Sequence, residues 1–199
     1  AIHTQDGDIQ YHYLSASGQL DSLTWPDGDS LSYRYDGGLV TRQSWTGTVH
    51  GQVDFGYDSD FRVISIGLNQ ADSVAYGYDK DGLITQAGEL SLTRQPQNGL
   101  LAGTALGAVS DSISYNGFGE TSDYQATVNG VPLIRWTYQR DQLGRIIQKT
   151  ETSGGISHRL DYRYDDRGRL EQITDNGAIV AAYGYDANGN RTQLNGQTV

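Results

Sequence analysis

The feature that most constrains the fold of this chain is a short pattern that recurs along it. An aromatic residue, any residue, a tyrosine and an aspartate stand in a row, and most copies have a glycine three residues after the aspartate. The fullest copy spans residues 162–170, with Tyr162, Tyr164, Asp165 and Gly168 in the defining positions. Self-similarity at a regular spacing indicates a repeat architecture, so the unit of the repeat has to be identified first.

The other copies keep the pattern to different degrees. Their defining residues are Tyr33, Tyr35 and Asp36; Tyr57 and Asp58; Tyr76, Tyr78, Asp79 and Gly82; Asp141 and Gly144; and Tyr183, Tyr185, Asp186 and Gly189. Weaker copies place Ser15, Pro96 and Asn116 in the aspartate position, and Arg140 replaces the second tyrosine of the copy at Asp141. We therefore expect a single array over residues 1–199, of about nine repeats with a step of about 21 residues, least regular over 85–130.

Each repeat is expected to form a β-hairpin. Tyr162 and Tyr164 alternate with Arg163, which places both rings on one face of a strand. Asp165 can accept hydrogen bonds from the backbone N–H groups just ahead of it, and Gly168 suits a left-handed position that closes the turn.

Turns of a second kind are expected between the repeats. Asn129-Gly130 and Asn176-Gly177 suit primed two-residue turns. Two copies of the main turn depart from the pattern: Phe61 occupies a glycine position, which predicts a different turn, and Gly38 stands one residue early, which predicts a shorter one. The small residues 103–107 are expected to form a loop.

Composition supports an all-β fold. Gly accounts for 26 of 199 residues and Tyr for 14, whereas Pro occurs 3 times. Tyrosine favours strands, glycine serves turns, and proline would interrupt a sheet. About 18 strands are too many for a flat, open sheet, since twisted sheets rarely exceed ~10 strands without curling or splitting. We predict tandem hairpins in a long, curved or spiralling antiparallel sheet, with strand over more than about 40% of the chain.

Charge and residue usage exclude several classes of function. Lys and Arg number 14 against 24 Asp and Glu, a net charge of −10, which disfavours nucleic acid as a partner. The chain has no Cys for disulfides or thiolate ligands, and no apolar run long enough to span a membrane. Since it lacks Met and starts at Ala1, we expect a processed product or an excised fragment.

The repeated motif resembles that of the YD-repeat, or Rhs, proteins, most clearly over 33–40, 57–63, 76–84, 162–170 and 183–191. This family includes bacterial Rhs polymorphic toxins, the encapsulating components of insecticidal toxin complexes, and the extracellular repeats of teneurins. The resemblance implies hairpins that join into a strip of sheet and spiral into a hollow shell. It also implies other YD repeats and an effector domain of the parent chain as partners, and a secreted or cell-surface location reached by bacterial export.

No constellation of residues predicts catalysis or a cofactor. His3, His12, His50 and His158 lack the spacing of a metal motif. The stretch from Asp186 to Asn190 has oxygen ligands at positions 1, 3 and 5 of a calcium loop, but Arg191 and Gln197 occupy its glycine and glutamate positions. We therefore expect a non-enzymatic segment of shell wall with no metal and no cofactor.

One alternative is a carbohydrate-binding or adhesive module on the same sheet. Trp25, Trp45 and Trp136 are the candidates for stacking on sugar rings, together with the repeated tyrosines. The competing interpretation is that these rings pack on the sheet itself, as aromatic side chains two residues apart commonly do.

Overall fold

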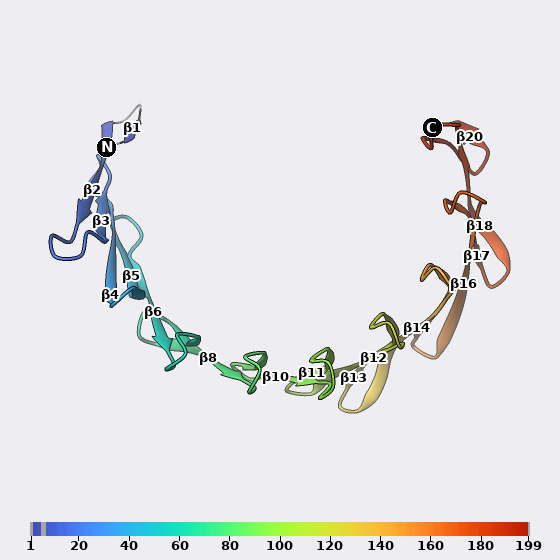
Figure 1. Ribbon diagram of the computed structural model, residues 1–199, viewed down its shortest axis with the longest axis horizontal. Coiled ribbons are helices and arrows are strands. Elements are labelled where there is room, and N and C mark those ends of the chain that lie inside the picture. Colours follow the sequence, from blue (N-terminus) through green and yellow to red (C-terminus); the bar gives the residue numbers. More distant parts are fainter. Residues whose placement is uncertain (1, 5–6, 199) are drawn as a thin grey trace. The chain divides into compact units, whose positions relative to one another are not determined.

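The computed structural model describes residues 2–4 and 7–198, with side chains from residue 7 onward. These residues form strands joined by turns, and no helix occurs among them (Figure 1). The chain divides into two units, Ala1–Glu89 and Leu90–Val199. The first unit contains β1 (Ile2–Thr4), β2 (Gly7–Tyr13), β3 (Leu20–Thr24), β4 (Ser30–Asp36), β5 (Leu39–Thr46), β6 (Gly51–Tyr57), β7 (Val63–Leu68), β8 (Asp72–Tyr78) and β9 (Ile84–Ala87).

The second unit contains β10 (Leu90–Arg94), β11 (Leu101–Leu106), β12 (Val109–Tyr115), β13 (Thr121–Val128), β14 (Val131–Arg140), β15 (Ile146–Ser153), β16 (Ile156–Tyr164), β17 (Leu170–Asp175), β18 (Ala178–Tyr185), β19 (Arg191–Leu194) and β20 (Gln197–Thr198). Within each unit every strand pairs antiparallel with the strand that follows it in the sequence. The prediction of an all-β fold built from tandem antiparallel hairpins is therefore confirmed.

The two faces of the sheet differ in chemistry. One face, here called the aromatic face, carries the repeated tyrosines and their aliphatic cross-strand partners, such as Tyr162 opposite Ile173. The other face is polar, with hydroxyl pairs such as Ser110 and Thr127, whose Oγ atoms are 2.9 Å apart. Ala126 alone is buried among the described side chains, at 8% exposure. Among the described residues of each unit, strands contact only the strands next to them in the sequence, and no further layer covers either face. Neighbouring hairpins therefore have to shield each other.

An irregularity of register recurs just before the second tyrosine position of the motif. In the pair β16–β17, Arg163 lies opposite Gln172 while Tyr164 lies opposite Leu170, so Glu171 has no partner in the ladder. The same one-residue shift occurs in the other hairpins. Such a bulge bends the strand and redirects the neighbouring side chain, here the second tyrosine.

The prediction of a loop over residues 103–107 is wrong, because Leu101–Leu106 form β11. A Cβ atom on Gly103 would lie 2.4 Å from the carbonyl oxygen of Asp111. The Asp111 carboxylate accepts hydrogen bonds from the backbone N–H and the hydroxyl of Thr104, at 2.5 and 3.0 Å. The small residues thus serve the close approach of two strands.

Two expectations about departures from the motif have different outcomes. The turn at Phe61 does not differ from the others: Phe61 takes the glycine's left-handed conformation, with φ of 63°, and its N–H donates to the Asp58 carbonyl at 3.1 Å. The turn after Asp36 is shorter, as predicted, since Asp36 pairs directly with Leu39.

Two assignments of the aspartate position are wrong by one residue. The turn after β2 is closed by the Gly18 N–H donating to the Leu14 carbonyl, and the turn after β10 by Gly99 donating to Gln95. Leu14 and Gln95, not Ser15 and Pro96, therefore stand in the aspartate position. Each of these turns is one residue longer than the turn that follows Asp165. The extra residue is not apparent from the sequence, because the motif is poorly preserved in these two repeats.

Candidate functional site

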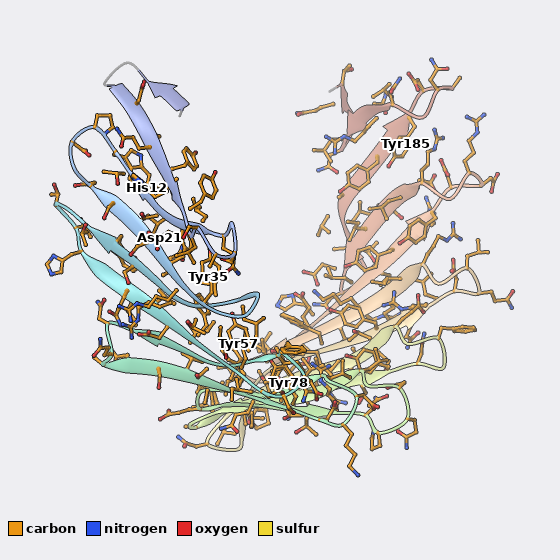
Figure 2. All side chains as sticks on the ribbon, turned by 60° about the vertical axis from the view of Figure 1, so that its left-hand side comes forward. His12, Asp21, Tyr35, Tyr57, Tyr78 and Tyr185 are labelled. Carbon is orange, nitrogen blue, oxygen red and sulfur yellow. The ribbon has the colours of Figure 1, made fainter. Side chains whose placement is uncertain are left out.

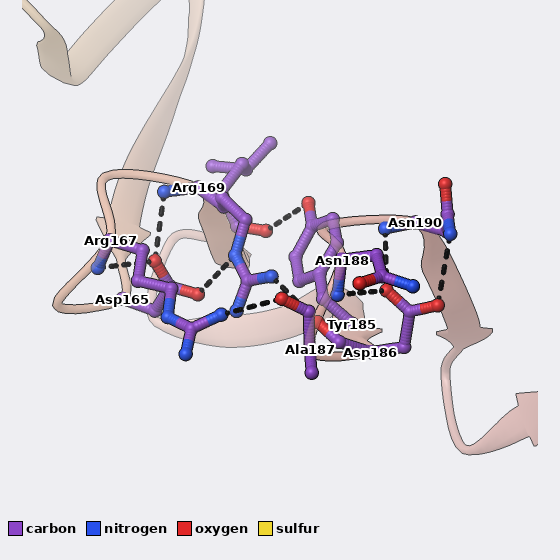
Figure 3. A network of polar contacts seen from close by, with 9 residues as sticks. Asp165, Arg167, Arg169, Tyr185, Asp186, Ala187, Asn188 and Asn190 are labelled. Carbon is purple, nitrogen blue, oxygen red and sulfur yellow. Dashed lines mark hydrogen bonds and ion pairs between the residues drawn. The ribbon is translucent and has the colours of Figure 1, made fainter.

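The turn after the second tyrosine is organised by one carboxylate. Asp165 Oδ1 accepts hydrogen bonds from the backbone N–H groups of Arg167 and Arg169, both at 2.9 Å, and Oδ2 accepts from Arg169 Nε at 2.8 Å (Figure 3). Gly168, with φ of 80°, donates its N–H to the Asp165 carbonyl at 2.9 Å. A single aspartate therefore accepts hydrogen bonds from the backbone N–H groups of three residues of the turn, Arg167, Gly168 and Arg169.

The same arrangement recurs after the other strands, and we call it the Asp turn. The carboxylates of Asp58, Asp79, Asp141 and Asp186 each accept bonds from the backbone N–H groups two and four residues ahead. The closing glycines Gly82, Gly144 and Gly189 have φ of 78°, 79° and 91°. Asn116 makes the equivalent bonds with its amide oxygen. Asp36 differs, because its shorter turn leaves its exposed carboxylate without a hydrogen bond among the described residues.

These bonds change the acidity of the turn carboxylates. Backbone hydrogen bonds from Arg62 and Arg169 lower the pKa values of Asp58 and Asp165, respectively. The pKa of Asp186 is lowered chiefly by the side-chain hydrogen bond from Asn190. Donors that bind the ionised form favour it, so these aspartates are held as carboxylates.

The second tyrosine of six repeats reaches back to the preceding hairpin, and we call this contact the tyrosine latch. Tyr185 Oη donates to the carbonyl oxygen of Leu170 at 2.8 Å, and Tyr164 donates to Ile146 at the same distance. Figure 2 shows Tyr35, Tyr57 and Tyr78 following one another along consecutive hairpins of the first unit. Their acceptors are Leu20, Val40 and Val63, at 2.7, 2.8 and 2.6 Å, and Tyr115 donates to Leu101 at 2.8 Å.

Arg140 shows that the latch survives a change of residue type. Its Nη2 atom donates to the carbonyl oxygen of Thr121 at 3.2 Å, the acceptor that a tyrosine in this position would use. Glu120 lies 3.3 Å from Arg140 Nε, which balances the added charge. The weakened motif at this position therefore preserves the contact between hairpins through a different donor.

Arginines extend the contact between adjacent hairpins. The Arg169 guanidinium lies over the Tyr185 ring, 4.5 Å from its centroid, while Nη1 donates to the Asp186 carbonyl at 3.1 Å (Figure 3). Arg167 Nη1 donates to the Ala187 carbonyl at 3.0 Å. One Asp turn is thereby bonded both to its own strand and to the next Asp turn.

The first tyrosines of the motif lie on the aromatic face. Tyr33 stacks on Tyr35, with centroids 6.4 Å apart and an interplanar angle of 28°. Tyr162 lies opposite Ile173, and burial raises the pKa of its phenol. Tyr76 and Tyr183 take equivalent places opposite Ala87 and Leu194. These rings cover the sheet locally, whereas the second tyrosines bridge between hairpins.

Sequence reasoning missed a second contact between strands, made by asparagines of the short turns. Asn176, with φ of 47°, accepts the Arg159 N–H at its Oδ1 atom at 3.0 Å and donates its own N–H to the Arg159 carbonyl at 2.8 Å. Asn195 binds Ala182 in the same way. The Asn-Gly dipeptide predicts the turn type. The bond from the asparagine side chain to a neighbouring strand depends on where Asn176 and Asn195 lie in the fold, beside a preceding strand.

The three tryptophans are half-buried on the sheet. Trp136 stacks on Tyr124 at 5.0 Å between centroids, and Lys149 Nζ lies 5.0 Å from the Trp136 centroid. Trp25 and Trp45 line one groove of the first unit. The structure therefore brings two of the candidate stacking residues together and places the third against its own strand neighbours.

Metal binding finds little support in the geometry. Both oxygens of the Asp186 carboxylate accept bonds from N–H donors of Asn188 and Asn190, so they are already engaged. No cluster of potential metal ligands occurs within residues 7–198. His158 Nδ1 lies 3.1 Å from Asp175 Oδ2, and the side chain of His3 is outside the described part of the chain.

The described residues include no helix long and apolar enough to cross a bilayer.

Comparisons with known proteins agree with this architecture. Human teneurin-4 is 26% identical over 196 residues, a stretch that covers 92% of this chain and 7% of that protein. The tRNA nuclease WapA of Bacillus subtilis (strain 168) is 27% identical over 194 residues, covering 88% of this chain and 8% of that protein. The chain thus spans less than a tenth of these relatives.

A solved structure shares the fold. A chain of the Photorhabdus luminescens Tc holotoxin pore superposes with a TM-score of 0.60 over 96% of this chain and 13% of its own length, at 12% identity. The model of one protein family, the teneurin YD-shell, matches residues 1–199. With the Asp turns and tyrosine latches on which its hairpins depend, this chain belongs to the teneurin YD-shell family.

Proposed function

We propose that this chain is a non-catalytic segment of shell wall, which encloses or presents an effector domain of the longer protein to which it belongs. The observation that carries the proposal is the tyrosine latch: each latched hairpin is fastened to the one before it, and Ala126 is the only buried side chain among those described. Stability that arises between neighbouring repeats suits a surface that extends by adding repeats.

In this proposal the residues of the repeated motif have structural roles. Asp165 and Gly168 shape a turn, and Tyr164 and Tyr185 fasten hairpins together. Among the described residues, we find no nucleophile or general base outside this motif whose position suggests catalysis. The nuclease named among the relatives is matched over 8% of its length, and we assign this chain no part of that activity.

The proposed setting follows from the relatives. Tc holotoxin and teneurin chains indicate a secreted or cell-surface protein, and we infer bacterial export for this one. Its partners would be further YD repeats and the enclosed domain of the same polypeptide. Residues 1–199 would then form a single uninterrupted array within the wall.

The test is protease protection in the full-length protein that carries this segment. A double variant, Tyr164→Phe with Tyr185→Phe, removes two latch hydroxyls and leaves both rings in place. If the segment is wall, a protease should cleave the enclosed domain faster in the variant than in the wild type, by several-fold.

Two controls keep the test specific. Tyr13→Phe removes an exposed hydroxyl that makes no hydrogen bond with a described residue, and should leave protection unchanged. An activity screen on polysaccharides, peptides and tRNA should show no turnover by residues 1–199. Equal protection in all variants, or turnover by this segment, would overturn the proposal.

A further inference from the structure

A grouping of three side chains recurs in this protein: a carboxylate, a cation bound to it, and an aromatic ring under the cation. Arg169 bonds to Asp165 and lies 4.5 Å from the centroid of Tyr185. Further groupings include Asp58, Arg62 and Tyr78; Asp141, Arg145 and Tyr164; and Glu151, Lys149 and Trp136. In each, attraction to the carboxylate and to the ring's π-electrons acts on one cation.

The groove that contains Trp25 and Trp45 holds two of these three components. It has a volume of about 480 Å³ and is also lined by Asp27 and Asp29. No Lys, Arg or His lines it, and neither carboxylate forms an ion pair with a described residue. Two indole rings and two negative charges therefore share a groove to which this part of the chain supplies no cation.

Glycines at two positions allow the side chains that line this groove to take their places. A Cβ atom on Gly47 would lie 1.9 Å from Asp29 Oδ1, so the Asp29 carboxylate occupies space that only a glycine leaves. Asp29 donates its N–H to Asp27 Oδ1 at 3.1 Å, which ties the two acidic residues together. Trp45 lies against Gly51, where a Cβ would come within 2.6 Å of its ring.

We propose that this groove binds an arginine side chain presented by a polypeptide partner. A guanidinium can stack on an indole while its N–H groups bond to carboxylates, and its planar fork suits two acceptors better than an ammonium does. Gln43, Ser30 and Thr46 add side-chain acceptors to the same lining. The two carboxylates disfavour an acidic partner. This site uses only the first unit and does not depend on the wall function.

Tryptophan indole N–H signals of the intact chain test the proposal directly by NMR. The sequence has 3 tryptophans, which single Trp→Phe variants assign. On titration with N-acetyl-arginine amide, the signals of Trp25 and Trp45 should shift saturably, with a dissociation constant in the millimolar range. Trp136 should not shift, because Lys149 already lies over its ring. N-acetyl-citrulline amide, which has the same shape without the charge, should give no saturable shift.

Charge variants complete the test. Asp27→Asn with Asp29→Asn should weaken arginine binding about fivefold or more, since an exposed cation–π contact alone is weak. The amide oxygen that Asp27→Asn introduces can still accept the backbone bond from position 29, which preserves the turn. Asp72→Asn, which removes an exposed charge elsewhere in the first unit, is the matched control and should have no effect. Equal shifts with citrulline, shifts produced by neutral saccharides instead, or no loss in the double variant would overturn the proposal.

Discussion

Tyr185 Oη lies 2.8 Å from the carbonyl oxygen of Leu170, and this bond joins two consecutive hairpins of the second unit. Tyr185→Phe keeps the ring and removes the donor. We expect the free energy of unfolding to fall by about 1 kcal/mol, the usual worth of one such hydrogen bond. Urea unfolding measures it. Tyr13→Phe is the control, since Tyr13 is 61% exposed and makes no such bond; a similar loss in both variants would refute the latch.

Phe61 carries a conformational cost that a glycine would avoid. Its φ of 63° is unfavourable for an L-residue, and its side chain is 71% exposed and contributes little packing. Phe61→Gly should stabilise the chain by up to about 1 kcal/mol, after the greater entropy of glycine in the unfolded chain is counted. The opposite kind of change at another turn, Gly168→Val, replaces a glycine with a β-branched residue. It should destabilise the chain by about 1–3 kcal/mol. A melting temperature that falls in Phe61→Gly, or rises in Gly168→Val, would contradict this account of the turn.

Much of this fold follows from patterns that a single sequence displays. The alternation of Tyr162 and Tyr164 predicts the strand, and Asp165 and Gly168 predict the turn, because both signals depend on residues close in the chain. The acceptor of Tyr164, the Ile146 carbonyl, lies nearly a full repeat earlier, and no local rule points to it. Phe61 shows that glycine is a preference of this turn and not a requirement.

The asparagines illustrate the same limit at the short turns. Asn129 and Asn176 both begin Asn-Gly turns with similar φ, 51° and 47°, but only Asn176 uses its side chain to bond a neighbouring strand, at Arg159. Asn→Gly preserves the freedom to adopt positive φ and removes only the side chain. Asn176→Gly should therefore lower the unfolding free energy by about 0.5–1 kcal/mol more than Asn129→Gly. Equal losses in chemical denaturation would count against the asparagine contact.

Acid should weaken the fold through the Asp turns. The pKa values of Asp58, Asp165 and Asp186 are lowered, so their stabilisation is complete above the ordinary value of about 3.9 and is lost as the pH falls toward their folded values. Melting temperature should therefore drop steeply below about pH 4.

A variant that does not titrate provides the control for this acid dependence. Asn116 makes the bonds of the Asp turn with an amide, so Asp58→Asn, Asp165→Asn and Asp186→Asn together should fold and should flatten the acid limb of the profile. An unchanged acid limb in this triple variant would assign the effect to other groups.

The central claim is that these residues are wall, and a cryo-electron microscopy map of the full-length protein tests it most directly. We expect residues 1–199 to continue on both sides into further hairpins of the same sheet, with one face of that sheet turned toward an enclosed domain. A map in which this segment instead projects into solvent as a separate body, with no enclosed density beside it, would contradict the account.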